Sequence, residues 1–282
     1  RFGISVASAG DFNGDGKSDV IVGADKDGNT GSAFIFFGGI TGTKRADADA
    51  DVILNGQSNS DDFGGSVSSA GDFNGDGKDD VIVGAPGDDN NSLAQSGSAF
   101  IFFGGITGTK TADADADVIF NGQSAGDEFG NTVTSAGDFN GDGKDDVIVG
   151  APGDDNNSTD ASGSAFIFYG GITGTKTADA DADVIFNGQS ADDRFGGINF
   201  NDGLYGRSLG AGDFNGDGTS DVIVGTREDD NNSASRSGSA FVFLSSGAFP
   251  SITFSDTTST QSESTTSVTI PVTLSKTSSS TV

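Results

Sequence analysis

One nine-residue acidic block occurs four times in this 282-residue chain and constrains its fold more than any other feature. It reads DFNGDGKSD from Asp11, DFNGDGKDD from Asp72 and again from Asp138, and DFNGDGTSD from Asp213. Each copy lies in a longer unit with one order: an FG segment, the acidic block, DVIVGA or DVIVGT, a polar loop, and GSAF. In the first three units a second polar loop and an ADVI segment follow. A repeat of this length predicts a fold assembled from similar pieces.

Each full unit contains four short strand signals separated by Gly, Asn, Asp and Pro turns, without helical periodicity. The runs at 81–83 and 100–103 are apolar on both alternating faces, which predicts strands covered on both sides. The segment before each acidic block, such as 64–71, is rich in Gly and Ser and suits a crowded position where sheets converge. These units predict an all-β fold, a β-propeller with four visible four-stranded blades, alone or within a larger propeller. A solenoid of stacked sheets is the alternative.

The charge balance limits the partners of the chain. It has 42 Asp and Glu against 14 Lys and Arg, a net charge of −28, which repels nucleic acid and anionic membranes and favours cations. No apolar run reaches the roughly 18 residues needed to span a bilayer, so we expect no membrane insertion in this segment.

The composition also argues against an enzyme. The chain has no His and no Cys, which excludes Ser-His and Cys-His nucleophile systems from these residues. Every unit repeats the same Asp residues, so no pair of carboxylates is distinguished as catalytic. We therefore expect no catalytic site.

The acidic block has the chemistry of a calcium loop. Its D-x-N-x-D-G-x-x-D spacing places side-chain oxygens at positions 1, 3, 5 and 9, leaves position 7 to offer a backbone carbonyl, and has Gly at the sharp turn. Oxygen-only ligands on a flexible loop suit Ca²⁺. An EF-hand is excluded because position 12 is Val in every copy and the flanks are strand-like. Position 8, which is Ser in two copies (Ser18 and Ser220), is expected to face solvent.

The motifs FGGSV, GDFNGDGKDD and VGAP (63–86) resemble the FG-GAP repeat through its full length, and the resemblance extends over about residues 1–245. FG-GAP repeats form the blades of the integrin α-subunit head and of many bacterial surface proteins. The resemblance implies about four Ca²⁺ ions, one in each loop between the first two strands of a blade. Integrin-like propellers have seven blades, and since the chain opens in mid-pattern at RFGISV, further blades are expected upstream.

The resemblance also implies the ligands of each ion. In order along the chain they are Asp11, Asn13, Asp15, the Lys17 carbonyl and Asp19; Asp72, Asn74, Asp76, the Lys78 carbonyl and Asp80; Asp138, Asn140, Asp142, the Lys144 carbonyl and Asp146; Asp213, Asn215, Asp217, the Thr219 carbonyl and Asp221.

These features predict a Ca²⁺-binding propeller that is secreted or displayed on a cell surface, with a bacterial origin expected, and that serves in adhesion or protein–protein interaction. Its partner would be a protein or glycan at a surface, or a further copy of itself. The alternative is a structural subunit of a Ca²⁺-bridged extracellular filament, sheath or surface layer.

The C-terminal segment and the acidic DADAD runs allow further predictions. Residues 1–248 are assigned to the propeller and 249–282 to a Ser/Thr-rich segment, which is either a disordered linker or, since ITFSDTTSTQSESTTSVTIPVTLS resembles it, the opening strands of a Calx-β domain. The DADAD runs at 47–51, 113–117 and 179–183 project their Asp side chains on one side if extended. They are expected to form a solvated edge that discourages sheet pairing, or else to recruit extra cations.

Overall fold

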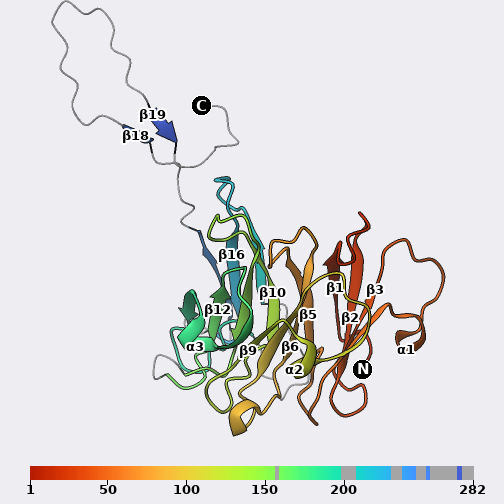
Figure 1. Ribbon diagram of the computed structural model, residues 1–282. Helices are drawn as coiled ribbons and strands as arrows, with labels where there is room; N and C mark the ends of the chain where they lie inside the picture. Colours follow the sequence, from red (N-terminus) through yellow and green to blue (C-terminus); the bar gives the residue numbers. More distant parts are fainter. Residues whose placement is uncertain (156–158, 198–207, 230–236, 246–251, 255–271, 275–282) are drawn as a thin grey trace, which may run out of the picture. The chain divides into compact units, whose positions relative to one another are not determined.

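Four mostly antiparallel sheets follow one another along the chain, and each has one acidic block between its first two strands. The computed structural model describes residues 1–155, 159–197, 208–229, 237–245, 252–254 and 272–274 (Figure 1). The chain divides into two units, Arg1–Ser245 and Ser246–Val282. All four sheets lie in the first unit.

Each sheet starts with a meander in which neighbouring strands are consecutive in sequence, the arrangement of a propeller blade. Blade 1 has β1 (Ser5–Gly10), β2 (Asp19–Ala24), β3 (Ser32–Phe36) and β4 (Val52–Asn55). Blade 2 has β5 (Ser66–Gly71), β6 (Asp80–Ala85), β7 (Ser98–Phe102) and β9 (Val118–Asn121). Blade 3 has β10 (Thr132–Gly137), β11 (Asp146–Ala151), β12 (Ser164–Phe168) and β14 (Val184–Asn187). Blade 4 has, among the described residues, β15 (Leu209–Gly212), β16 (Asp221–Thr226) and β17 (Ser239–Phe243).

The inner strands β1, β5, β10 and β15 are neighbours in that order. Residues of all four line a central cavity of about 210 Å³, including Val6, Val67, Val133 and Leu209. Small residues allow this approach: Ser66 Oγ accepts the Val133 amide of the next inner strand at 3.0 Å. Convergence of four inner strands on one cavity is the arrangement of a propeller and differs from that of a stacked solenoid.

The second and third strands fill the space between blades. Every residue of β6, β7, β11 and β12 is buried, as the two-sided apolar runs predict. One cluster joins Phe63 to Phe100 and Phe102, and the next joins Phe129 to Phe166 and Phe168. The rings meet edge to face, for example at 5.6 Å between the centroids of Phe63 and Phe100. Burial of these side chains between successive sheets holds the blades together.

Two strands cross from one blade to the preceding one. β8 (Gly108–Thr111) pairs parallel with β4 of blade 1, and β13 (Gly174–Thr177) pairs parallel with β9 of blade 2. The first two sheets therefore have five strands. This crossing was not predicted from the sequence.

The DADAD runs are not extended edges, and that expectation is wrong. Each begins within a single helical turn: α1 (Ala46–Asp49), α2 (Ala112–Asp115) and α3 (Ala178–Asp181). The last Asp of the turn accepts a backbone amide four residues earlier, as Asp115 does from Thr111 at 2.8 Å. The final Asp of the run, Asp117, accepts the Phe103 amide at 2.8 Å. Backbone amides that bind these Asp side chains thus favour a helical turn over an extended strand. A short 3₁₀ turn, η1, covers Asn90–Ser92.

The second unit contributes one pair of short strands among its described residues. β18 (Ile252–Phe254) pairs antiparallel with β19 (Val272–Leu274). Most of the segment that resembles a Calx-β domain lies outside the described residues, so that assignment stays a prediction. Across the described parts of both units, no helix has the length and apolar character needed to cross a bilayer.

Candidate metal centres

The acidic blocks form the loops between the first and second strands of the four blades. In the first three blades the strand register shifts just before the loop, where a Gly precedes the first Asp. Gly10 has a φ of 65°, in the left-handed region that favours glycine. This local bulge turns the chain out of the sheet and into the loop.

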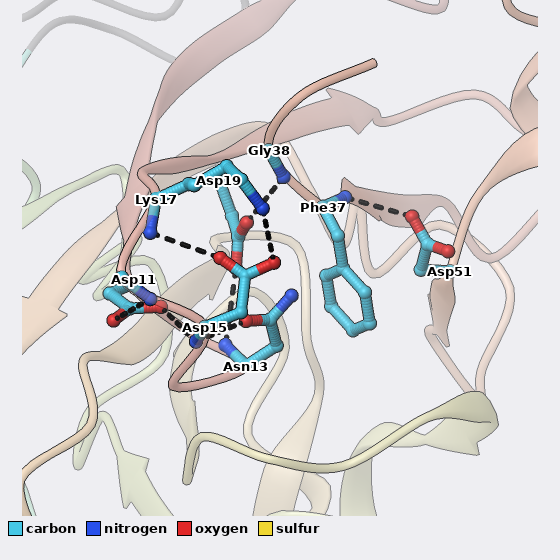
Figure 2. A network of polar contacts seen from close by, with 9 residues as sticks. Asp11, Asn13, Asp15, Lys17, Asp19, Phe37, Gly38 and Asp51 are labelled. Carbon is cyan, nitrogen blue, oxygen red and sulfur yellow. Dashed lines mark hydrogen bonds and ion pairs between the residues drawn. The ribbon is translucent and has the colours of Figure 1, made fainter.

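Inside each loop the oxygen-bearing side chains fold back over the backbone. In the first loop Asp11 accepts the amides of Asp15 and Gly16 with its two oxygens, each at 2.8 Å. Asn13 Oδ1 also accepts the Asp15 amide at 2.8 Å, and Asp15 Oδ1 accepts the Lys17 amide at 3.0 Å (Figure 2). The same four bonds occur in the other three loops. Positions 1, 3 and 5 are therefore ordered by the loop itself.

The Asp at position 9 lies beneath the loop and joins it to the third strand. Asp19, Asp80, Asp146 and Asp221 are all fully buried. One oxygen of Asp19 accepts the Asn13 amide at 3.1 Å and the other accepts the Gly38 amide at 2.6 Å (Figure 2). Asp80 makes the corresponding bonds with Asn74 and Gly104. Position 9 thus connects the acidic loop to the end of the third strand.

Burial disfavours the charged form of three position 9 carboxylates, those of Asp19, Asp80 and Asp146. Desolvation raises the pKa of Asp80 to about 7 and that of Asp146 to about 6. Hydrogen bonds from backbone amides lower these pKa values but only partly offset the effect of burial. The negative charges of Asp72 and Asp76 raise the pKa of Asp80 further. The pKa of Asp19 is raised in the same way. A cation placed in the loop would oppose this effect and favour the charged form.

The position 7 residues differ in how they meet the position 5 carboxylate. Lys17 Nζ lies 3.0 Å from Asp15 Oδ2, and this hydrogen bond lowers the pKa of Asp15. In the fourth loop Thr219 Oγ1 donates to Asp217 Oδ1 at 2.5 Å. No ion pair links Lys78 or Lys144 to its own loop in the described structure. The expected role of these residues, through their carbonyls, stays a prediction.

The loops fit Ca²⁺ by the chemistry of their donors, which are all oxygens. Within the described residues, no three Asp or Glu side chains converge closely enough to enclose a metal ion as they lie. Their oxygens instead face backbone amides. A carboxylate oxygen that accepts one amide keeps a further lone pair, and the Asn side chain and backbone carbonyls add neutral donors. Ligation would therefore need small side-chain rotations within a loop whose backbone is already ordered.

Position 8 is exposed in the first loop, at Ser18, but it is half-buried in the other three loops, so the expectation that it faces solvent is wrong there. Asp79 Oδ2 accepts the amide of Asp11 in the preceding loop at 2.6 Å. Asp145 Oδ2 likewise accepts the amide of Asp72 at 2.8 Å. A Cβ on Gly10 would lie 2.2 Å from the Asp79 carboxylate, so the Gly before the loop is needed for this approach. The first and second acidic loops are thus each bonded to the loop of the next blade.

Backbone bonds extend this link. The Gly105 amide donates to the Phe12 carbonyl at 2.7 Å, and the Gly171 amide donates to the Phe73 carbonyl at 2.7 Å. Asp79 and Asp145 are the functional candidates that the sequence interpretation missed. A signal was present: position 8 is Asp only in copies 2 and 3. The spacing alone does not say that this side chain meets a different blade.

Comparison with known proteins identifies similar chains in two groups. A segment of 161 residues is 33% identical to phosphatidylinositol-glycan-specific phospholipase D of Bos taurus, covering 54% of this chain and 19% of that protein. A segment of 229 residues is 30% identical to integrin alpha-5 of Xenopus laevis, covering 79% of this chain and 20% of that protein. Integrin alpha-PS5 of Drosophila melanogaster is 33% identical over 54% of this chain and 15% of its own length. The chain thus spans about a fifth or less of these relatives.

The family comparison agrees with the blades. The model of the FG-GAP repeat matches residues 2–36, 63–102, 129–168 and 205–243, together more than half of the chain. Each match contains one complete acidic loop and the second and third strands of one blade. The chain belongs to the FG-GAP repeat family.

Proposed function

We propose that this chain is a Ca²⁺-stabilised propeller that mediates adhesion or protein–protein interaction at a cell surface or outside the cell. The observation that supports this best is that all four FG-GAP matches contain a complete acidic loop. Similarity to integrin alpha-5 over 79% of the chain adds to it, since integrin α subunits are the named relatives with the widest coverage given above.

The residues that would hold Ca²⁺ are those at positions 1, 3, 5, 7 and 9 of each loop. Ca²⁺ would supply positive charge to a loop that carries three carboxylates, at positions 1, 5 and 9. Positions 1, 3 and 5 orient their oxygens through amide bonds, and position 9 fixes the loop to the third strand. The role proposed for the ion is therefore structural: it stabilises one face of the propeller on which a partner could dock.

A non-enzymatic role is part of the proposal. The phospholipase D relative is matched over only 19% of its length, which is too little to transfer its activity. Each blade repeats the same acidic residues in the same contacts, and a repeated structural site explains this better than a single catalytic centre does.

Metal analysis tests the calcium sites. Protein dialysed against Ca²⁺-containing buffer and then against metal-free buffer should retain close to four Ca²⁺ per chain. Asp72→Ala should lower this number by one, because only the second loop loses its position 1 carboxylate. A count of zero or one in the parent protein would contradict the proposal.

The alternative function, a subunit of a Ca²⁺-bridged filament, sheath or surface layer, is favoured by the nearly identical repeats and the net charge of −28. Adhesion requires a foreign partner, whereas assembly requires another copy of the chain. Sedimentation with and without Ca²⁺ separates the two: Ca²⁺-dependent growth to large species supports assembly. Ca²⁺-dependent binding to intact cells by a chain that does not grow supports adhesion.

A further inference from the structure

The four acidic loops, numbered 1 to 4 in chain order, are joined in series by backbone hydrogen bonds. At each of the three junctions the position 8 amide of one loop donates to the position 1 carbonyl of the preceding loop. The donors and acceptors are Asp79 to Asp11 at 3.3 Å, Asp145 to Asp72 at 3.3 Å and Ser220 to Asp138 at 3.2 Å. Position 1 is also a proposed Ca²⁺ ligand, so each junction reaches a residue of a proposed site.

A side-chain bond strengthens the first two junctions. Asp79 Oδ2 accepts the Asp11 amide at 2.6 Å, and Asp145 Oδ2 accepts the Asp72 amide at 2.8 Å. Position 8 of loop 4 is Ser220, and within the described residues its hydroxyl forms no hydrogen bond with the amide of position 1 in loop 3. Loops 1, 2 and 3 are therefore linked through carboxylates, whereas loop 4 is linked to loop 3 by backbone alone.

The position 7 side chains differ in the same way. A Cβ on Gly14 would lie 3.4 Å from three methylene carbons of Lys78, and a Cβ on Gly75 would lie 3.3 Å from Lys144 Cε. The stem of each Lys therefore lies against position 4 of the preceding loop. Thr219, at this position in loop 4, has no such stem.

Two glycines after β7 connect position 9 of one loop to the preceding loop. The Gly104 amide donates to Asp80 Oδ1 at 2.8 Å, and the next amide, that of Gly105, donates to the Phe12 carbonyl at 2.7 Å. A Cβ on Gly104 would lie 2.6 Å from the Asp79 carbonyl oxygen and 2.7 Å from that of Phe12, so this position between the two loops requires Gly. The same two bonds recur at the next junction.

We propose that Asp79 and Asp145 couple the calcium sites of neighbouring blades, so that loops 1, 2 and 3 fill cooperatively and loop 4 fills independently. This inference rests on the proposed calcium sites and adds how they depend on one another. Asp79 and Asp145 are positioning residues, because they hold the backbone of a ligand and do not touch the ion themselves.

The coupling follows from the order of residues in the chain. Asp80 is a proposed ligand of loop 2, and the adjacent Asp79 holds Asp11, a proposed ligand of loop 1. An ion that orders Asp80 also orders Asp79 and, through it, Asp11. The ion that enters loop 1 then loses less conformational entropy on binding, which is positive cooperativity. The effect is reciprocal, so an ion in loop 1 favours binding in loop 2 by the same factor.

Calorimetric titration of the metal-free full chain with Ca²⁺ tests the coupling. The parent should bind three ions cooperatively and one independently. Asp72→Ala empties loop 2, which has a coupled neighbour on each side, and should lower the affinity of loops 1 and 3 about fivefold or more. Asp213→Ala is the matched control, since it removes the same position from loop 4 and should leave the other three affinities unchanged.

The outcomes separate the coupling from the calcium sites on which it rests. Equal effects of the two variants on the remaining ions would overturn the coupling. Four ions that bind independently to the parent would also overturn it and would leave the proposed calcium sites intact. A parent that binds no Ca²⁺ would overturn both.

Substitutions at position 8 test the assigned contact. Asp79→Ala removes the acceptor and should lower the Hill coefficient, whereas Asp79→Asn keeps an oxygen for the Asp11 amide and should retain the parent value. Ser220→Ala is the control and should change neither affinity nor cooperativity. When Asp79→Ala and Asp145→Ala are combined, emptying loop 2 should weaken loops 1 and 3 about twofold or less. An undiminished loss in that background, or equal behaviour of the Ala and Asn variants, would contradict the assigned contact.

Hydrogen exchange gives a readout other than affinity. In a chain whose loop 1 is emptied by Asp15→Ala, Ca²⁺ in loop 2 should slow exchange of the Asp11 amide, and adding Asp79→Ala should abolish this slowing. The matched control empties loop 3 by Asp142→Ala, and Ca²⁺ in loop 4 should then leave exchange of the Asp138 amide unchanged. Equal slowing of the two amides would overturn the proposal.

Discussion

Adjacent carboxylates at positions 8 and 9 of the acidic loop have different partners. Asp80 is fully buried and receives amides from its own loop and from the third strand. Asp79 is half-buried and receives an amide from the loop of the preceding blade. Two neighbours with equal charge thus act on two different loops, one within its own blade and one across a junction.

Asp80→Asn should lower Ca²⁺ affinity in the second loop at least about tenfold, because loss of even an outer-shell partner of a metal site typically costs about that much. Asp79→Asn should leave this affinity nearly unchanged, because an Asn oxygen can still accept the Asp11 amide and position 8 is not a proposed ligand. Calorimetric titration of both variants measures this. Equal losses would mean that long-range charge, rather than ligation by position 9, controls binding.

Close approach of backbones fixes the identity of one Gly in the second strand of each of the first three blades. A Cβ on Gly84 would lie 2.0 Å from the Gly130 carbonyl oxygen of the next blade. On Gly225, the equivalent residue of blade 4, the nearest atom would be the Ser208 carbonyl oxygen at 3.5 Å, an ordinary contact.

Gly84→Ala should therefore destabilise the fold by roughly 1–3 kcal/mol, the usual cost of overpacking, since backbone must move to relieve the clash. Gly225→Ala should change stability by less. Chemical denaturation of both variants, compared through their midpoints, gives the difference. A Gly84→Ala variant as stable as the parent would show that the blades can separate at this point without cost.

At the scale of elements, the sequence predicts what depends on local pattern. The runs DVIVGA and SAFIF are strands buried on both sides, as their apolar residues indicate. The crossing strands β8 and β13, both GTKT, have no alternation of apolar residues. Their partner strands lie more than fifty residues earlier, so the local sequence pattern does not predict them. The DADAD runs are misread because amide bonds to their own carboxylates, which a pattern of charges does not reveal, select a helical turn.

Acidic side chains are also buried where successive blades meet, and their protonation makes the stability of the fold depend on pH. Desolvation raises the pKa of Asp61 and of Asp127 to about 7, and nearby carboxylates add to this: Asp88, Asp89 and Asp113 for Asp61. A carboxyl group whose pKa is higher in the folded state holds its proton more tightly there than in the unfolded chain. Its contribution to stability is greatest below the unfolded pKa, near 4, and falls as pH rises to about 7.

In a chelator, thermal stability should therefore be higher at pH 5 than at pH 7.5. Asp61→Asn should reduce this difference, because the amide keeps an acceptor for the Ser58 amide and has no charge to desolvate. Asp115→Asn, at an exposed position of α2, is the control and should leave the difference in stability between pH 5 and pH 7.5 unchanged. Stability that falls on acidification to pH 5 would contradict the assigned direction.

At the scale of the whole molecule, four acidic loops lie side by side along bonded blades, and the chain has a net charge of −28. The repeat predicts the number of visible blades and the place of each loop within its blade. It does not predict the hydrogen bonds between acidic loops, or the pairing of β8 with β4 and of β13 with β9, because these form between residues of different repeats. Inter-repeat contacts depend on how far each blade is rotated from the last.

Removal of Ca²⁺ should lower the melting temperature strongly. Control salts distinguish two causes of this loss: loss of ligation in the loops and loss of charge screening. Binding to the folded state alone contributes about 2.7 kcal/mol per site at a hundredfold excess over the dissociation constant, or about 5–10 °C per site for a chain of this size. If Ca²⁺ acted only by screening the net charge, then NaCl at higher ionic strength, or Mg²⁺ at the same concentration, would restore the loss. Ligation by flexible loops predicts that Mg²⁺ restores little, since it requires shorter bonds and strict octahedral geometry. Melting curves in chelator, NaCl, Mg²⁺ and Ca²⁺ compare these cases directly, and equal recovery in all three salts would show that the loops are ordinary acidic turns.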